Sequence, residues 1–305
     1  MTRILLVSFL LLATVLGHAQ KTPQQELIES GILKAKMGDF KQAIRDFDMA
    51  VKLDSAEPEP YYNRGIALTE LKDYSGAIRD FSRVIQLKPS RPEPYYNRGL
   101  ARDYIKDYAG AIRDYNSAIS LKADYFEAYH NCGLAKFDLG HFREAVEDFS
   151  RAIQYKPDFA EAYYNRGLSR FNLDDLTNAT LDFSEAIMLD NTQYEYYASR
   201  GAAKADLKIF EEAVADFSIA LSLNPNDVNS RMNLALAYMY LKRYPEAVAV
   251  YDMIVEGNPA DGDVIADRGV ARHYLGDNRA ACEDWQKAAD LGAEKAKTYL
   301  LKFCE

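Results

Sequence analysis

The sequence predicts an all-α solenoid of eight 34-residue helix-turn-helix repeats, closed by a C-terminal capping helix. Three observations support this prediction: a glycine, an alanine and an aromatic residue each recur every 34 residues, in fixed phase and without insertion. The glycines are Gly31, Gly65, Gly99, Gly133, Gly167, Gly201 and Gly269, and Ala235 stands at the one remaining position. A period of this length indicates units that stack on their neighbours, because a single unit cannot bury its apolar face.

The repeats fill the region 20–295 and are numbered in chain order. They span 24–57, 58–91, 92–125, 126–159, 160–193, 194–227, 228–261 and 262–295. The glycine stands at position 8 of a repeat, the alanine at position 20 and the aromatic residue at position 24. The alanines are Ala43, Ala77, Ala111, Ala145, Ala179, Ala213, Ala247 and Ala281, and the aromatic residues are Phe47, Phe81, Tyr115, Phe149, Phe183, Phe217, Tyr251 and Trp285. Residues 296–305 begin a ninth first helix and then stop, which predicts a cap whose Phe303 covers the exposed end.

The glycine at position 8 indicates close packing between the two helices of a repeat. Glycine inside a helix costs about 1 kcal/mol relative to alanine, so its recurrence needs a structural reason. Without a side chain at this position, the second helix can lie directly against the first. Prolines support the helix limits. Pro58 and Pro92 stand in first turns, where proline is tolerated, whereas Pro89 and Pro157 fall where second helices end.

Residues 1–19 are typical of a secretory signal peptide. Arg3 gives a positive start, the run 4–16 is almost entirely apolar, and Gly17-His18-Ala19 ends it with small residues at the two cleavage-specificity positions. The apolar run is shorter than the ~20 residues of a spanning helix. We therefore expect cleavage after Ala19 and an exported protein, periplasmic or secreted, without membrane insertion. An uncleaved anchor is the alternative.

Charge and motifs exclude several classes of function. The chain has 46 acidic and 37 basic residues, a net charge of −9, which disfavours nucleic acid as a partner. The histidines are His18, His130, His141 and His273; His130 and His141 stand eleven residues apart in repeat 4, and His273 stands in repeat 8. No metal-ligand spacing, phosphate-binding glycine loop or nucleophile motif is present. The sequence therefore predicts no catalytic residue, no metal and no cofactor.

Three cysteines are present, so at least one stays free or pairs between chains. Cys282 lies near the start of the last second helix and Cys304 near the end of the cap. The chain reverses around Gly292, and antiparallel helices with a rise of about 1.5 Å per residue would bring the two cysteines nearly level. A disulfide between them and two buried free thiols are both open. Cys132 is expected to be free in either case.

The segment Tyr61-Tyr62-Asn63-Arg64-Gly65, continued by Ala77 and by Phe81 to Pro89, resembles the tetratricopeptide repeat family. The resemblance covers all but the N-terminal segment and the last ten residues, and the N-terminal end resembles exported proteins of the Bacteroidetes type. It implies a right-handed superhelical solenoid that binds other proteins. It also implies that the first helices line a concave face, with positions 2, 5, 6 and 9 pointing into it.

Two columns on this expected concave face are candidate peptide-binding residues. Position 6 carries Asn63, Asn97, Asn131 and Asn165, and position 5 carries Tyr62, Tyr96, His130 and Tyr164. A carboxamide can bond both polar groups of an extended peptide backbone, and aromatic faces suit a peptide. The structural alternatives are that the asparagines bond the backbone of their own or of the neighbouring repeat, and that the aromatic residues pack between repeats. Position 5 changes to small residues after repeat 5, which would place the binding end in repeats 2 to 5.

Arginine stands at position 7 of repeats 2, 3, 5, 6 and 8, aspartate stands at position 23 of every repeat except repeat 7, and repeat 7 lacks both. This joint loss predicts ion pairs within repeats, such as Arg98 with Asp114 and Arg166 with Asp182. On function, we expect an interaction scaffold or adaptor that binds an extended peptide or partner segment on its concave face. The alternative is a structural subunit of a cell-envelope assembly that docks through the convex face or the end caps. Oligomeric state is left open.

Overall fold

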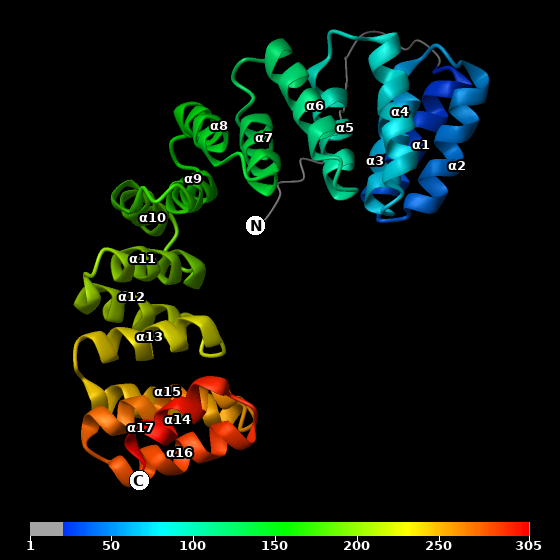
Figure 1. Ribbon diagram of the computed structural model, residues 1–305. Coiled ribbons are helices and arrows are strands. Elements are labelled where there is room, and N and C mark those ends of the chain that lie inside the picture. The colour runs from blue at the N-terminus through cyan, green and yellow to red at the C-terminus, as the bar shows by residue number, and fades with distance from the viewer. Residues whose placement is uncertain (1–20, 305) are drawn as a thin grey trace. The chain divides into compact units, whose positions relative to one another are not determined.

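A computed structural model describes residues 21–304, and it places 17 α-helices and no strand in that range. The predicted signal peptide, residues 1–19, lies outside the described residues. Contacts divide the chain into two compact units, Met1–Asn165 and Arg166–Glu305, with the division inside α9 (Ala160–Asn172) (Figure 1). Within the described range, no helix is both long and apolar enough to cross a membrane.

Each predicted repeat contains two helices. In the first unit these are α1 (Pro23–Lys36), α2 (Phe40–Leu53), α3 (Pro58–Glu70), α4 (Tyr74–Leu87), α5 (Pro92–Tyr104), α6 (Tyr108–Leu121), α7 (Phe126–Asp138) and α8 (Phe142–Tyr155). In the second unit these are α10 (Leu176–Leu189), α11 (Tyr194–Asp206), α12 (Phe210–Leu223), α13 (Val228–Tyr240), α14 (Tyr244–Gly257), α15 (Gly262–Leu275) and α16 (Asn278–Asp290), followed by α17 (Glu294–Phe303). The odd-numbered helices up to α15 are the first helices of repeats, and the even-numbered ones are the second helices. The all-α repeat fold is therefore confirmed.

Short polar turns separate the two helices of a repeat. In repeat 2, Lys72 takes a positive φ of 62° and turns the chain, and the Asp73 carboxylate then accepts a hydrogen bond from the Gly76 amide. A side-chain acceptor at this place satisfies one of the free N–H groups at the start of α4. Asp39, Asp107 and Asp277 cap their helices in the same way.

The glycine at position 8 permits close helix packing, as predicted, and the partner is the aromatic ring at position 24. A Cβ atom added to Gly99 would lie 2.7 Å from Cε1 of Tyr115, and one added to Gly65 would lie 2.8 Å from Cε1 of Phe81. Both rings are buried. The fixed spacing of the two residue types therefore reflects one contact, in which a ring lies on a bare stretch of helix.

Arginine and aspartate pair within repeats, as the sequence predicts. Arg98 Nη2 lies 2.6 Å from Asp114 Oδ1, and Arg166 Nη2 lies 2.7 Å from Asp182 Oδ1. These are not surface ion pairs, because the Asp114 side chain is only 3% exposed and the Arg98 side chain 17% exposed. The same arginine also reaches the preceding repeat: Arg98 Nη1 donates to Ser82 Oγ at 3.0 Å. These residues therefore join neighbouring repeats as well as the helices of one repeat.

The C-terminal end is covered by α17. Ala296 is fully buried, the Tyr299 ring stacks on Trp285 at 5.2 Å, and the Phe303 ring lies 5.7 Å from Trp285. Cys282 and Cys304 are joined by a disulfide with Cα atoms 5.8 Å apart, within the range that such a bond requires. The cap thus buries the last apolar face of the second unit.

Candidate functional site

Three of the four predicted asparagines at position 6 contact the preceding repeat, whereas Asn63 Nδ2 donates to the Glu59 carbonyl of its own helix at 3.0 Å. Asn97 Nδ2 donates to Tyr62 Oη at 2.9 Å, and Asn131 Nδ2 donates to Tyr96 Oη at 2.8 Å. Asn165 Nδ2 lies 3.0 Å from His130 Nε2. In each pair the two residues are 35 positions apart, so position 6 of one repeat meets position 5 of the repeat before it. Six of the eight predicted residues therefore form three contacts between consecutive repeats.

Seven of the eight predicted peptide-binding residues are buried. They are Asn63, Asn97, Asn131, Asn165, Tyr62, Tyr96 and His130, all at most 8% exposed, and Tyr164 is half-buried. A peptide could reach these buried carboxamides only if the surrounding side chains moved. The sequence predicts that both columns line one concave surface. The spacing of residues does not show that side chains of one column contact those of the other. Peptide binding at these residues stays a prediction.

His130 is a core residue of this set. Its ring lies 4.7 Å from the Phe159 ring and 5.6 Å from the Phe149 ring. Burial lowers the pKa of His130 from 6.5 to about 4, because the charged imidazole would lose its hydration. The histidine is therefore neutral near pH 7. Its Nδ1 atom is buried and has no hydrogen-bond partner among the described residues.

Asn233, at position 6 of repeat 7, differs from the buried asparagines. The residue 35 positions before it is Ala198, which has no polar atom to accept a hydrogen bond. Asn233 is half-buried, and its carboxamide has no hydrogen-bond partner within residues 21–304. The loss of an aromatic residue in one repeat therefore releases the asparagine of the next.

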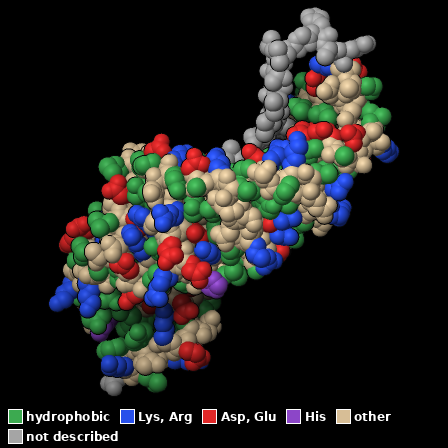
Figure 2. Space-filling model, turned by 90° about the horizontal axis from the view of Figure 1, so that it is seen from above, with side chains coloured by type: hydrophobic (Ala, Val, Ile, Leu, Met, Phe, Trp, Pro, Cys, Tyr) green, Lys and Arg blue, Asp and Glu red, His purple; other side chains and the backbone are tan. Residues whose placement is uncertain are grey.

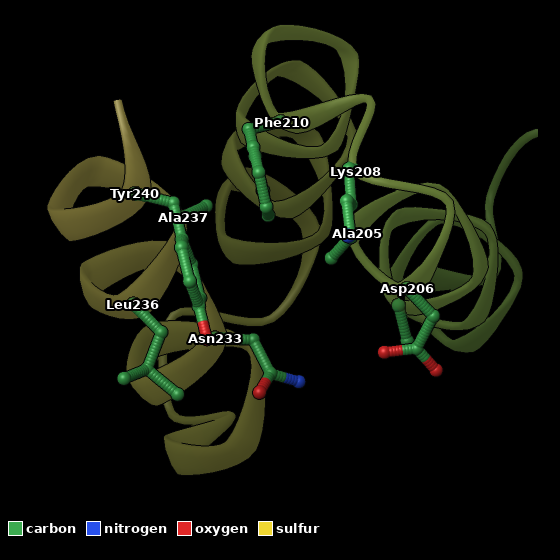
Figure 3. Close-up of a pocket in the computed structure, with 9 residues that line it drawn as sticks. Ala205, Asp206, Lys208, Phe210, Asn233, Leu236, Ala237 and Tyr240 are labelled. Carbon is green, nitrogen blue, oxygen red and sulfur yellow. The ribbon is translucent and has the colours of Figure 1, made fainter.

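Asn233 lies in a groove of about 370 Å³ in the second unit, between α11 and α13. Its lining consists of Ala202, Ala205, Asp206, Lys208, Phe210, Asn233, Leu236, Ala237 and Tyr240. Figure 3 shows the Asn233 carboxamide between the side chains of Leu236 and Asp206, with the Phe210 ring entering from α12. The groove combines an apolar lining with one available amide.

Small side chains on α11 account for the groove. Ala202 and Ala205 stand at positions 9 and 12 of repeat 6. Leucine occupies position 9 in repeats 3, 4 and 5, as Leu100, Leu134 and Leu168, and phenylalanine occupies position 12 in repeats 4 and 5. Sequence reasoning took the change to small residues as the end of the binding region. In the structure, the small residues at positions 9 and 12 of repeat 6 line a groove in repeats 6 and 7. The placement of a binding end in repeats 2 to 5, which rested on position 5, stays a prediction.

The groove can hold an apolar side chain together with a polar backbone group. The Phe210 and Tyr240 rings stack at 4.6 Å with an interplanar angle of 6° and form an aromatic edge. Tyr240 is 69% exposed and Leu236 is 40% exposed, so apolar surface is available to a ligand. Asp206 and Lys208 give the rim one charge of each sign. An amide in an apolar setting is the kind of group that fixes the orientation of a bound chain.

Metal and thiol chemistry have no site in the described residues. Within them, no three His, Cys, Asp or Glu side chains cluster in a way that could hold a metal ion. Cys132 is buried and free, as expected, and burial raises the pKa of its thiol above the ordinary value. A protonated, buried thiol is a poor nucleophile, so Cys132 is a packing residue that replaces the arginine of position 7.

Comparisons with known proteins identify the repeat. Profiles described as "Tetratricopeptide repeat" match residues 58–91, 160–193 and 203–262, and one described as "TPR repeat" matches 105–140 and 133–174. Together these matches cover more than half of the chain. No curated protein matches it.

Three solved structures illustrate the likeness. A crystal structure of MamA shares 28% identity with a TM-score of 0.52, covering 53% of this chain and 94% of MamA. The C-terminal part of a TPR repeat-containing protein from Cytophaga hutchinsonii shares 17% identity with a TM-score of 0.66, covering 78% and 98%. YrrB, described as a TPR protein with an unusual peptide-binding site, shares 18% identity with a TM-score of 0.55, covering 60% and 95%. The repeat register, the helical hairpins and these matches together show that the chain belongs to the tetratricopeptide repeat family.

Proposed function

We propose that this protein–protein interaction scaffold holds an extended segment of a partner protein in the groove between α11 and α13. The single observation that carries the proposal is the free carboxamide of Asn233 in an apolar groove. The Asn233 amide would donate to a backbone carbonyl of the segment and accept from a backbone N–H, because a carboxamide has both functions. One large apolar side chain of the segment would fill the space above Ala202 and Ala205.

The burial of the other asparagines supports this location. Asn97 and Asn131 each donate to a tyrosine and are buried inside the stack, so a ligand has no access to them in this arrangement. Asn233 has no such competitor, since Ala198 replaces the tyrosine. Leu236 and the exposed face of Tyr240 add apolar area that a bound segment would remove from water.

We further propose that the protein works after export, in the periplasm or outside the cell. The apolar run 4–16, which ends in small residues at positions 17–19, supports export. A disulfide between Cys282 and Cys304 is consistent with it, because such bonds persist mainly in oxidising compartments. N-terminal mass analysis of protein from its native host tests this: a chain starting at Gln20 is expected, and an intact Met1 would refute it.

The groove can be tested with random peptides displayed on phage and selected against the full chain. Enriched peptides, synthesised with a fluorescent label, should bind with an affinity measurable by anisotropy. Ala202→Leu restores the leucine of repeats 3 to 5 and should abolish binding by filling the groove. Asn233→Ala should weaken binding at least tenfold, since the backbone contact is lost.

Ala260→Leu is the matched control, because it makes the same substitution at an exposed site in the turn after α14. It should bind the peptides as the unmodified chain does. Peptides that bind equally well to the Ala202→Leu protein would show that the groove is not the site. Retained helical circular dichroism in every variant separates lost binding from lost folding.

A further inference from the structure

Exposed charge differs between the second helices of repeats 1 to 3 and those of repeats 5 to 7. The second helices of repeats 4 and 8, α8 and α16, expose residues of both signs and are not part of the contrast. In the first unit, α2, α4 and α6 carry six basic residues, Lys41, Arg45, Lys52, Arg79, Arg83 and Arg113. The acidic residues within these three helices are Asp46, Asp48, Asp80 and Asp114. Three of them are buried, and Asp48 pairs with Arg64 at 2.6 Å. The outward surface of these helices, called the basic face, is therefore positively charged.

In the second unit, α10, α12 and α14 contain no lysine or arginine. Instead they expose large apolar side chains: Leu181 at 59%, Met188 at 71%, Ile219 at 40% and Met253 at 50%. Leu181 stands at position 22 of its repeat, and Ile219 and Met253 stand at position 26. The first-unit residues at position 22 are Arg45, Arg79, Arg113 and Glu147. We call this second surface the apolar face.

Acidic residues flank the apolar face. Glu185 and Glu256 are exposed, and no described residue forms an ion pair with either of them. Glu211 is also exposed, although Arg243 lies 3.7 Å from it. Hydrophobic side chains interspersed with charged ones are visible on the face of the molecule in Figure 2. Exposed apolar groups in consecutive repeats, with acidic residues beside them, are typical of an interaction surface rather than of free solvent-facing helices.

We propose that copies of this chain associate head to tail, the apolar face of one molecule packing against the basic face of another. The two faces are complementary in charge. The basic face carries arginines and lysines, and the apolar face carries glutamates with no basic residue between them. Arginine stems are apolar, so they can cover Leu181 and Ile219 while their guanidinium groups reach Glu185 and Glu256. The basic face also exposes Met49 at 45% and Leu53 at 58%, which supply further apolar contact.

Contact between two copies of the same face is disfavoured. Two basic faces would bring the arginines of α4 and α6 against each other, and two apolar faces would bring Glu185 and Glu256 near their own copies. Like charges across an interface oppose association. A contact between unlike faces leaves one face free on each molecule, so it produces chains or rings rather than a closed dimer. Such association is what a structural subunit of an assembly needs.

Sedimentation velocity of the full chain over a broad concentration range tests the proposal. The average mass should rise above the 34.5 kDa of one chain and fall again as salt is added, because salt screens the charged part of the contact. Leu181→Glu with Ile219→Glu blocks the apolar face, and Arg79→Glu with Arg113→Glu blocks the basic face. Each double variant should sediment as a monomer by itself.

Mixing the two blocked variants gives the decisive result. Each retains one working face, so an equimolar mixture should form a one-to-one dimer and nothing larger. Arg279→Glu, a charge reversal at a residue on α16 that is 91% exposed, should leave association unchanged. A chain that stays monomeric at all concentrations would overturn the proposal, and so would a basic-face variant that still dimerises. The Ala202→Leu groove variant should associate normally, which separates this proposal from peptide binding.

Discussion

Asn97 Nδ2 donates a hydrogen bond of 2.9 Å to Tyr62 Oη, which joins position 6 of repeat 3 to position 5 of repeat 2. The same relationship recurs between Asn131 and Tyr96 at 2.8 Å. It is broken between Asn233 and Ala198, where the acceptor is missing. One pairing rule therefore explains both why most of these asparagines are buried and why Asn233 is available in a groove.

Tyr62→Phe should destabilise the protein by about 1–3 kcal/mol, because it leaves the buried Asn97 amide without this acceptor. Urea denaturation followed by circular dichroism measures the loss. Tyr274→Phe removes a hydroxyl from a ring that is 59% exposed and should have little effect. Equal stability of the two variants would mean that the Asn97–Tyr62 bond does not hold the repeats together.

Gly99→Ala should destabilise the protein although alanine favours helix. The new Cβ would lie 2.7 Å from the buried Tyr115 ring, and overpacking typically costs about 1–3 kcal/mol, more than the ~1 kcal/mol gained in helix propensity. Gly257→Ala is the matched control, since its Cβ would meet no atom within 4 Å at the end of α14. The control should be neutral or stabilising. Two variants with the same sign of effect would refute the close-packing explanation.

The contribution of His130 to the stability of the protein should fall as the pH decreases from about 6.5 to about 4. The folded pKa of His130 is lowered to about 4 by burial, whereas the unfolded chain titrates at the ordinary value of 6.5. Between these values the unfolded state binds more protons, so acid favours unfolding, and the contribution of His130 is complete above pH 6.5. Thermal unfolding at stepped pH values measures the effect.

His130→Tyr should remove this part of the pH dependence, because tyrosine does not titrate in that range. Tyrosine stands at the same position in repeats 2, 3 and 5 and supplies a hydroxyl to which Asn165 can donate. A His130→Tyr protein whose acid sensitivity equals that of the unmodified chain would assign the dependence to other groups.

Removal of the Cys282–Cys304 bond should loosen the cap. Cys282→Ser with Cys304→Ser removes a crosslink across 22 residues, for which chain entropy predicts a loss of about 3 kcal/mol. Hydrogen exchange should speed up in α17 while α3 to α6 keep their protection. Thiol titration of denatured, unreduced protein should find one free thiol, Cys132. Three free thiols would show that the bond does not form.

The sequence alone determined the helical repeat fold, the close packing at position 8 and the arginine–aspartate pairs. These features depend on residues at fixed short spacing within one repeat, such as Gly99 with Tyr115 or Arg98 with Asp114. Helical geometry converts such spacing directly into contact, so the pattern can be interpreted without coordinates.

The tertiary structure decided what the position 5 and position 6 columns do. Asn97 and Tyr62 meet because consecutive repeats stack with a particular rotation, and nothing in the spacing of 35 residues specifies whether two side chains face a ligand or each other. The groove at Asn233 follows from the same geometry, since an alanine creates space only where a neighbouring helix would otherwise contact a larger side chain. Contacts within a repeat are local and can be predicted from the spacing of residues, whereas contacts between repeats depend on how the hairpins pack.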